Sequence, residues 1–165
     1  MSIPLLLFED YSPDREAFEE LLSESFEVSS CSTVHEAIEL LTSESFSVAV
    51  LDMASSEQDR EAGLRVLKHI AENELSVSSI VLTGAGTIEN CVEAMKLGAL
   101  DYVVKGKEET ADKILSAAIT ASTHTQAHLR VALNRETEMA FRAICVKIGA
   151  GTFVELIQEE SRQRR

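Results

Sequence analysis

The feature that most constrains this sequence is a regular alternation of short apolar runs with stretches of helical periodicity. Each run has the length of a single strand. The five runs are Ile3–Phe8, Phe26–Cys31, Val48–Leu51, Ile80–Leu82 and Tyr102–Val104. Most of them are continuously apolar rather than alternating with polar residues, which is typical of strands that are buried on both faces.

Helix signals occupy the segments between these runs. Ser12–Pro13 predicts an N-cap followed by proline at the first helical position. Thr33–Glu36 has the pattern of a capping box, in which two side chains satisfy free N–H groups of the first helical turn. Apolar residues at helical spacing predict a third helix across residues 64–71 and a fifth across residues 114–119.

The fourth helix is expected to begin at Thr87, to end at Gly98 and to turn Val92 and Met95 toward the core. Strand and helix thus alternate five times, and this order predicts an α/β fold with helices on both faces of a parallel sheet. We expect a doubly wound five-stranded sheet with the strand order 2-1-3-4-5, followed by a C-terminal helical extension. In such a sheet, ligands bind beyond the carboxyl ends of the strands, where the strand order reverses.

Polar side chains follow four of the five apolar runs. Glu9 and Asp10 end the first run, Asp52 the third, Thr83 the fourth and Lys105 the fifth. The first and third strands are neighbours in the expected order, so three carboxylates converge, which is costly unless a cation lies among them. Ligands that are all oxygen favour a hard ion such as Mg²⁺. With a hydroxyl and an ammonium beside them, such carboxylates suit the stabilisation of a transferring phosphoryl group, which one of them can accept as nucleophile.

This set of residues, in this order and at these strand ends, resembles the receiver domain of two-component response regulators, whose fold is flavodoxin-like. The resemblance covers roughly residues 3–122. It implies that Asp52 is the phosphoacceptor. It also implies a Mg²⁺ site formed by Glu9, Asp10, Asp52 and the backbone carbonyl of Ala54, and phosphoryl-contacting or switch roles for Thr83, Gly84, Tyr102 and Lys105.

Two departures from the family pattern stand near this site. Gly106 follows Lys105 where the family usually has proline, and glycine has no bias toward a fixed turn. The loop after Asp52 lacks the usual proline and is longer than usual, and it brings Glu57 and Asp59 near the mouth of the site.

The function that the resemblance implies is that of a phosphoprotein in a two-component system or phosphorelay. A histidine kinase or a phosphotransfer protein would supply the phosphoryl group to Asp52. The Thr83 hydroxyl would then move inward, and Tyr102 would turn into the vacated space. This would change the face formed by the fourth helix, the fifth strand and the fifth helix. The chain would not be an enzyme, apart from its own phosphorylation from a phosphodonor and its autodephosphorylation.

The charge balance limits the partners. The net charge of −13 argues against nucleic-acid binding and against attraction to anionic membranes. Three widely spaced cysteines form no zinc or redox motif and favour a reducing, cytoplasmic location. The charge is uneven, with −15 in residues 1–122 and +2 in residues 123–165. We therefore expect a receiver domain over residues 1–122 and a helical extension over residues 123–165.

The extension contains the segment MAFRAICVKIG, which is apolar around much of a helix and needs a surface to cover it. We expect it to mediate dimerisation or partner docking, with a homodimer through the C-terminal helices as the first hypothesis. His124 and His128 stand four residues apart, but surface histidines explain them better than a metal site does. No helix-turn-helix pattern is present in the sequence.

Other functions stay open on the sequence alone. The chain could be a scaffold of receiver fold that is never phosphorylated, or the N-terminal receiver fragment of a larger signalling protein. A haloacid-dehalogenase-type phosphatase would need a second aspartate two residues after Asp52, where the chain has Ala54. An FMN-binding loop would need more hydroxyl and glycine residues than follow the first strand.

Overall fold

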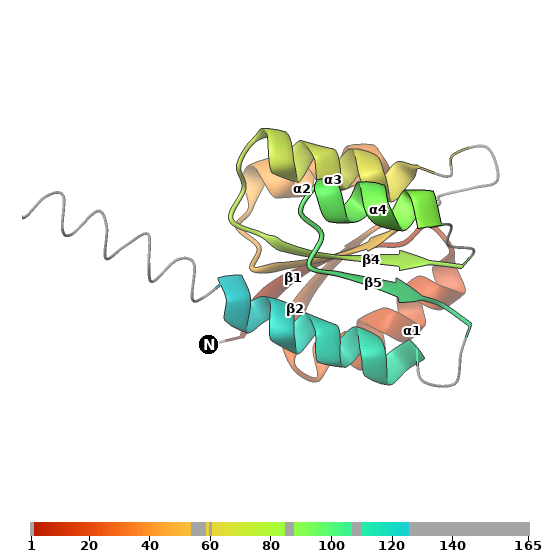
Figure 1. The fold of residues 1–165 in the computed structure, drawn as a ribbon. Helices are drawn as coiled ribbons and strands as arrows, with labels where there is room; N and C mark the ends of the chain where they lie inside the picture. Colours follow the sequence, from red (N-terminus) through yellow and green to blue (C-terminus); the bar gives the residue numbers. More distant parts are fainter. Residues whose placement is uncertain (1, 54–58, 60, 85–87, 107–109, 126–165) are drawn as a thin grey trace, which may run out of the picture. The chain divides into compact units, whose positions relative to one another are not determined.

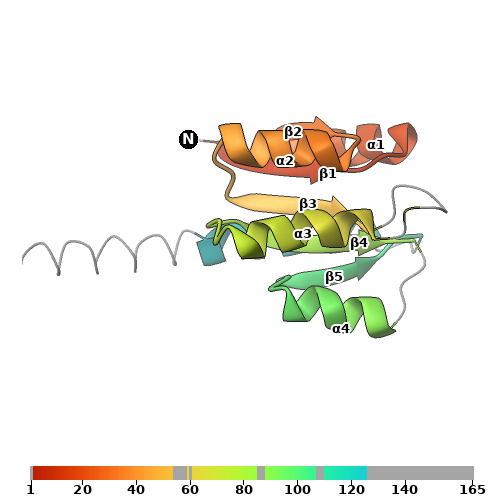
Figure 2. The ribbon, with the colours of Figure 1, turned by 90° about the horizontal axis from the view of Figure 1, so that it is seen from above.

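The five strands form one parallel sheet in the predicted order. The computed structural model describes residues 2–53, 59, 61–84, 88–106 and 110–125. Its strands are β1 (Ile3–Phe8), β2 (Phe26–Cys31), β3 (Val48–Asp52), β4 (Ser78–Thr83) and β5 (Asp101–Val104). Every neighbouring pair is parallel, and the order across the sheet is β2-β1-β3-β4-β5 (Figure 2). The doubly wound arrangement expected from the sequence is confirmed.

Helices cover both faces of the sheet. They are α1 (Ser12–Ser23), α2 (Val34–Ser43), α3 (Ala62–Glu72), α4 (Ile88–Lys96) and a helix over residues 110–125. The helices α2, α3 and α4 lie on one face, while α1 and the helix of residues 110–125 lie on the other (Figure 1). Within the described part of the chain, none of these helices has the length and apolar character needed to cross a membrane.

The sheet separates two apolar cores, and alternate residues of β1 point into each. Leu6 and Phe8 join the core beneath α2, α3 and α4, whereas Leu5 and Leu7 join the core beneath α1 and the helix of residues 110–125. All four side chains are fully buried. This explains why the strands are continuously apolar, since polar residues on either side would be removed from water.

The capping signals are realised with one shift. The box at Thr33 forms in both directions: the Thr33 hydroxyl accepts from the N–H of Glu36 at 3.2 Å, and the Glu36 carboxylate accepts from the N–H of Thr33 at 3.1 Å. The first helix begins one residue earlier than predicted, with Tyr11 at the N-cap, and Ser12 hydrogen-bonds Glu16 within the first turn. Gly98 ends the α4 segment with a φ of 93°.

The predicted orientation of α4 is wrong. Val92 is 45% exposed and Met95 is 48% exposed, while Ala94 is fully buried. Ile88, one turn before Val92, is 80% exposed. The apolar residues do share one face at helical spacing, but the small side chain packs on the sheet, and periodicity does not say which face is inward. An apolar stripe on α4, formed by Ile88, Val92 and Met95, is therefore open to solvent.

The last helix continues past the predicted domain boundary at residue 122. Thr125 is buried, and its hydroxyl lies 2.8 Å from the carbonyl oxygen of Ser47 and 2.6 Å from the hydroxyl of Ser78. Ser47 precedes β3 and Ser78 begins β4, so Thr125 attaches this helix to the sheet at the amino-terminal ends of these strands. The rest of the predicted extension, residues 126–165, lies outside the described residues.

Gly63 allows α3 to begin directly against the end of β3. Its N–H donates to the carbonyl of Met53 at 3.1 Å. A Cβ at this position would lie 2.4 Å from the backbone oxygen of Asp52, and backbone cannot give way as a flexible side chain can. The sequence interpretation did not identify this requirement.

We expect Gly63→Ala to lower the free energy of unfolding by about 1–3 kcal/mol, because α3 must move away from the Asp52 backbone. Alanine would otherwise favour a helix over glycine by about 1 kcal/mol, so the sign is informative. Urea denaturation measures the difference. Gly84→Ala is the control, because a Cβ at Gly84 meets nothing within 4 Å. A Gly63→Ala variant as stable as the parent would contradict the steric argument.

Candidate functional site

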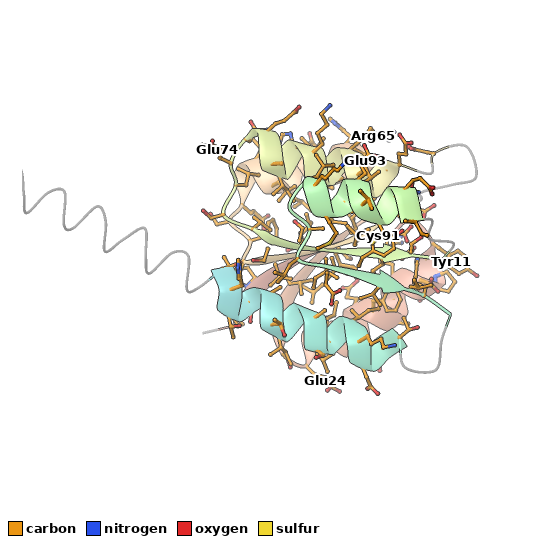
Figure 3. The ribbon with its side chains drawn as sticks, in the orientation of Figure 1. Tyr11, Glu24, Arg65, Glu74, Cys91 and Glu93 are labelled. Atoms are coloured by element: carbon orange, nitrogen blue, oxygen red, sulfur yellow. The ribbon has the colours of Figure 1, made fainter. Side chains whose placement is uncertain are left out.

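The candidate site lies at the carboxyl ends of the strands. Glu9 and Asp10 follow β1, and Asp52 is the last residue of the adjacent β3. Tyr11, the next residue after the acidic pair, lies at the end of the molecule toward which the strands point (Figure 3). Glu9, Asp10 and Asp52 each offer a carboxylate oxygen, and these oxygens all lie within 4.8 Å of one another. Glu9 is 1% exposed and Asp52 is 3% exposed, so two carboxyl groups are buried at one point.

Lys105 supplies the positive charge between them. Its Nζ lies 2.7 Å from Oε2 of Glu9 and 2.8 Å from Oδ1 of Asp52. The backbone N–H of Lys105 donates to the carbonyl of Thr83 at 2.7 Å, which continues the pairing of β4 and β5 and aims the side chain across the strand ends. Two residues 96 positions apart in the sequence are joined by this contact.

Burial and ion pairing shift the pKa values of both partners. Burial raises the pKa of Glu9 to about 7, and the Asp52 charge adds to the rise, while hydrogen bonding from Lys105 opposes it. Burial alone would lower the pKa of Lys105, but the two carboxylates outweigh it and raise that pKa to about 12. Lys105 is therefore an ammonium at neutral pH, and Glu9 is close to its midpoint of ionisation.

Arg15 holds the backbone that presents the acidic pair. Its Nη1 donates to the carbonyl oxygen of Glu9 at 2.9 Å and lies 3.3 Å from that of Asp10. The N–H of Glu9 donates to Cys31 at 3.1 Å, so the pairing of β1 with β2 extends one residue beyond the strand. Sequence reasoning missed Arg15. Its place in the first turn of the helix that follows the acidic pair is the signal that would have found it.

Thr83 and Tyr102 come together beside this cluster. Thr83 is the last residue of β4 and is 3% exposed. The hydroxyl of Tyr102 is buried, and no described group meets it in hydrogen-bond geometry. Burial raises the pKa of Tyr102, while the nearby Thr83 hydroxyl opposes the rise. The Tyr102 hydroxyl therefore lies buried beside Thr83 in this structure. Gly84 follows Thr83 and is exposed.

The two departures from the family pattern have structural answers. Gly106 has a φ of 84°, which proline cannot adopt, and there is no cis peptide bond in the described residues. The Asp59 carboxylate accepts a hydrogen bond from Arg65 of α3 at 2.8 Å, so it is paired with a cation. Glu57 and Ala54 lie outside the described residues.

The acidic cluster fits a magnesium ion. All three donors are carboxylate oxygens, the ligand type that Mg²⁺ prefers. Ligands on opposite sides of a Mg²⁺ ion are about 4 Å apart, close to the 4.8 Å limit of this cluster. Glu9, Asp10 and Asp52 would hold the ion. Lys105 is bonded to two of these residues, so the ammonium would compete with the ion for their carboxylates.

Comparison with known families agrees with the fold. The model of the response regulator receiver domain matches residues 5–119. Because this match covers more than half of the chain, the protein belongs to the receiver domain family of two-component response regulators. The family expected from the sequence is confirmed.

Curated relatives share only part of their length with this chain. The transcriptional regulatory protein FixJ of Rhizobium meliloti (strain 1021) is 38% identical over 63 residues, which cover 38% of this chain and 30% of FixJ. The acid tolerance regulatory protein ActR of the same organism is 38% identical over 94 residues, covering 57% of this chain and 46% of ActR. The chain therefore spans less than half the length of each.

Solved structures show the same fold. The signal receiver domain of a putative Luxo repressor protein from Vibrio parahaemolyticus matches with a TM-score of 0.71 at 20% identity, covering 79% of this chain and 98% of that domain. A CheY-like receiver domain protein from Methanospirillum hungatei JF-1 matches with a TM-score of 0.69 at 19% identity, covering 78% of this chain and 99% of that one.

The shifted pKa of Glu9 predicts a loss of stability as pH rises in the absence of Mg²⁺. Glu9 binds its proton more tightly in the folded chain, with a pKa of about 7 against an ordinary 4.5. The stability linked to this proton is present below pH 4.5 and is lost as pH rises through 7. Between about pH 5 and pH 8, we expect the parent to lose on the order of 1–3 kcal/mol relative to Glu9→Gln.

Urea denaturation of both proteins with a chelator present measures this difference. Glu16→Gln, which neutralises an exposed carboxylate on α1, is the control and should follow the parent. Parallel stability curves for the parent and Glu9→Gln would contradict the prediction.

Proposed function

We propose that this receiver domain accepts a phosphoryl group on Asp52 from a histidine kinase or a phosphotransfer protein. The observation that supports this most strongly is the convergence of Glu9, Asp10 and Asp52 with the ammonium of Lys105 at one end of the sheet. Isolated strand-end acids are common, but buried carboxylates are costly and seldom grouped without a cation to bind. Asp52 is the nucleophile because it ends the central strand β3. This strand lies between β1, which the acidic pair follows, and β4, which Thr83 ends.

The reaction is a transfer to a carboxylate oxygen. An oxygen of Asp52 forms a bond to phosphorus, and the bond from phosphorus to the donor atom breaks, with the electron pair leaving on the donor. Bound Mg²⁺ would supply positive charge against the phosphoryl oxygens. Lys105 would move one N–H from the Asp52 carboxylate to a phosphoryl oxygen, and the Thr83 hydroxyl would donate to another. The chemical activity of the chain is limited to this self-phosphorylation and to autodephosphorylation, in which water hydrolyses the acyl phosphate on Asp52.

The output face that we propose consists of α4, β5 and the helix of residues 110–125. The open apolar stripe on α4 lies here, and Val104 on β5 is 38% exposed. A groove of about 890 Å³ lies between β5 and the last described helix, and its lining includes Leu100 and Thr120. Tyr102 connects this face to the site, because its hydroxyl lies beside Thr83 while its strand borders the groove. A few kcal/mol would suffice to shift a two-state population.

A second hypothesis concerns the wider role. The relatives are named as transcriptional regulatory proteins, and the chain spans only part of their length. We infer that this domain also serves a regulator of transcription, either through a partner protein or as the receiver portion of a longer chain. Direct binding of nucleic acid by the described residues is not part of this hypothesis, because the chain has a net charge of −13.

Acetyl phosphate with Mg²⁺ should add one phosphoryl group to the chain, and Asp52→Asn should remove the label. Asp10→Asn should abolish Mg²⁺-dependent labelling, because the ion loses a ligand and its charge. Intact-protein and peptide mass spectrometry measure both. Asp59→Asn is the matched control and should label normally, since Asp59 is held by Arg65. A label located on Asp10 or Asp59 would rule out the assignment of Asp52.

The C-terminal extension should mediate self-association that depends on phosphorylation. A chain ending at Thr125 keeps the contacts of Thr125 with Ser47 and Ser78, so it should fold and accept phosphate as the full chain does. We expect it to lose the self-association that beryllofluoride and Mg²⁺ induce in the full chain. Analytical ultracentrifugation with and without beryllofluoride measures this.

Two results would contradict this role for the extension. Equal association of the shortened and full chains would exclude residues 126–165 as the dimer element. Association of the full chain that ignores beryllofluoride would disprove the coupling to phosphorylation. Val92→Lys tests the open stripe on α4 separately, because it changes that surface and leaves the extension intact.

A further inference from the structure

Lys105 has a third carboxylate partner, and it comes from α1. Oδ2 of Asp14 lies 3.4 Å from Nζ of Lys105, in addition to the closer contacts with Glu9 and Asp52. Asp14 stands in the first turn of α1, and its side chain is 41% exposed, whereas that of Lys105 is 14% exposed. Asp14 therefore approaches the ammonium from the solvent side of the site.

The surface of α1 supports Lys105 at a second point. Phe18 lies one turn after Asp14 on the same helical face, and the Lys105 Nζ is 6.0 Å from the centre of its ring. An aromatic face at this distance attracts a cation. The ammonium thus has partners of two kinds: the buried carboxylates at the strand ends, and the side chains of Asp14 and Phe18 on α1.

Only the first kind competes with a metal. The carboxylate oxygens of Glu9 and Asp52 belong to the cluster that would hold Mg²⁺, and Asp14 does not belong to it. If Glu9 and Asp52 turned their oxygens to a divalent ion, Lys105 would lose part of its bonding and would be repelled by the new charge. A carboxylate outside the metal's ligand set can keep the ammonium in place at that moment.

We propose that Asp14 is a positioning residue that holds the Lys105 ammonium against α1, so that Glu9 and Asp52 are released to Mg²⁺. This inference rests on the proposed function of the site. Asp14 adds a negative charge to the site, and it gives the ammonium an alternative to the metal's ligands. Removal of Asp14 weakens Mg²⁺ binding for both reasons.

The test is a calorimetric titration of the full chain with Mg²⁺ alone, in the parent, Asp14→Asn and Glu16→Gln. Glu16 is the matched control: it stands half a turn away on the same helix, loses the same charge, and bonds Ser12 rather than Lys105. We expect Asp14→Asn to weaken Mg²⁺ binding about three- to tenfold and Glu16→Gln to change it less than about twofold. Equal effects of the two variants would overturn the proposal.

The Mg²⁺ dependence of labelling by acetyl phosphate distinguishes positioning from a general structural defect. In Asp14→Asn the Mg²⁺ concentration for half-maximal labelling should rise by the same factor, and the maximal rate should stay within about twofold of the parent. A lower maximal rate at saturating Mg²⁺ would instead indicate damage to the site and would overturn the proposal.

A double-mutant cycle with Lys105→Ala shows whether Asp14 acts through the lysine. In the Lys105→Ala background, we expect Asp14→Asn to weaken Mg²⁺ binding by a smaller factor than it does in the parent, because only the effect of its charge remains. An unchanged effect of Asp14→Asn without the lysine would overturn the proposal. If Mg²⁺ binding depends on Asp14 as expected but Asp52 is never labelled, the proposed function fails while the positioning role stands. If Asp52 is labelled normally and Mg²⁺ binding does not depend on Asp14, the positioning role fails while the proposed function stands.

Discussion

The ion pair of Lys105 with Glu9 and Asp52 is the contact on which the arrangement of the strand ends depends. Two carboxylates that are almost completely removed from water would repel each other strongly, and a single ammonium lies between them at hydrogen-bond distance from both. Because β5 lies at one edge of the sheet and β1 next to the other, this pair also connects strands that do not touch each other. Removing the lysine would leave charges buried without a partner, which is far more costly than losing an exposed ion pair.

The parallel topology makes this convergence possible. All five strands end at the same edge, so residues that are distant in sequence meet there without any long loop having to bring them together. Helices on both faces keep that edge as the place where polar groups can gather, since the strand interiors are buried in two apolar cores. The first turn of α1 then completes the site with backbone contacts from Arg15 and a carboxylate from Asp14.

Sequence patterns predicted the parallel sheet from the alternation of strand and helix, and the polar residues at the strand ends from positions that immediately succeed apolar runs. The strand order is the one expected for a receiver fold. Three features were not predicted, each for a physical reason. Which side of α4 faces solvent depends on which face packs more closely on the sheet. The face with the small Ala94 is buried, and the face with Val92 is exposed. Gly63 matters through a backbone approach that has no sequence period. Arg15 bonds backbone oxygens, so no complementary side chain marks its role, and its position in the first turn of α1 was the available signal.

The attachment of Thr125 at the far edge of the sheet has a mechanical consequence. The helix of residues 110–125 begins beside β5, where the Thr110 hydroxyl is 3.5 Å from the carbonyl oxygen of Val104, and a helix of this length is a stiff rod of about 24 Å. With its far end held by Ser47 and Ser78, it can respond to a movement near Lys105 by pivoting about that end more easily than by sliding along the sheet. A helix held in this way would act as a lever whose fulcrum is its Thr125 end.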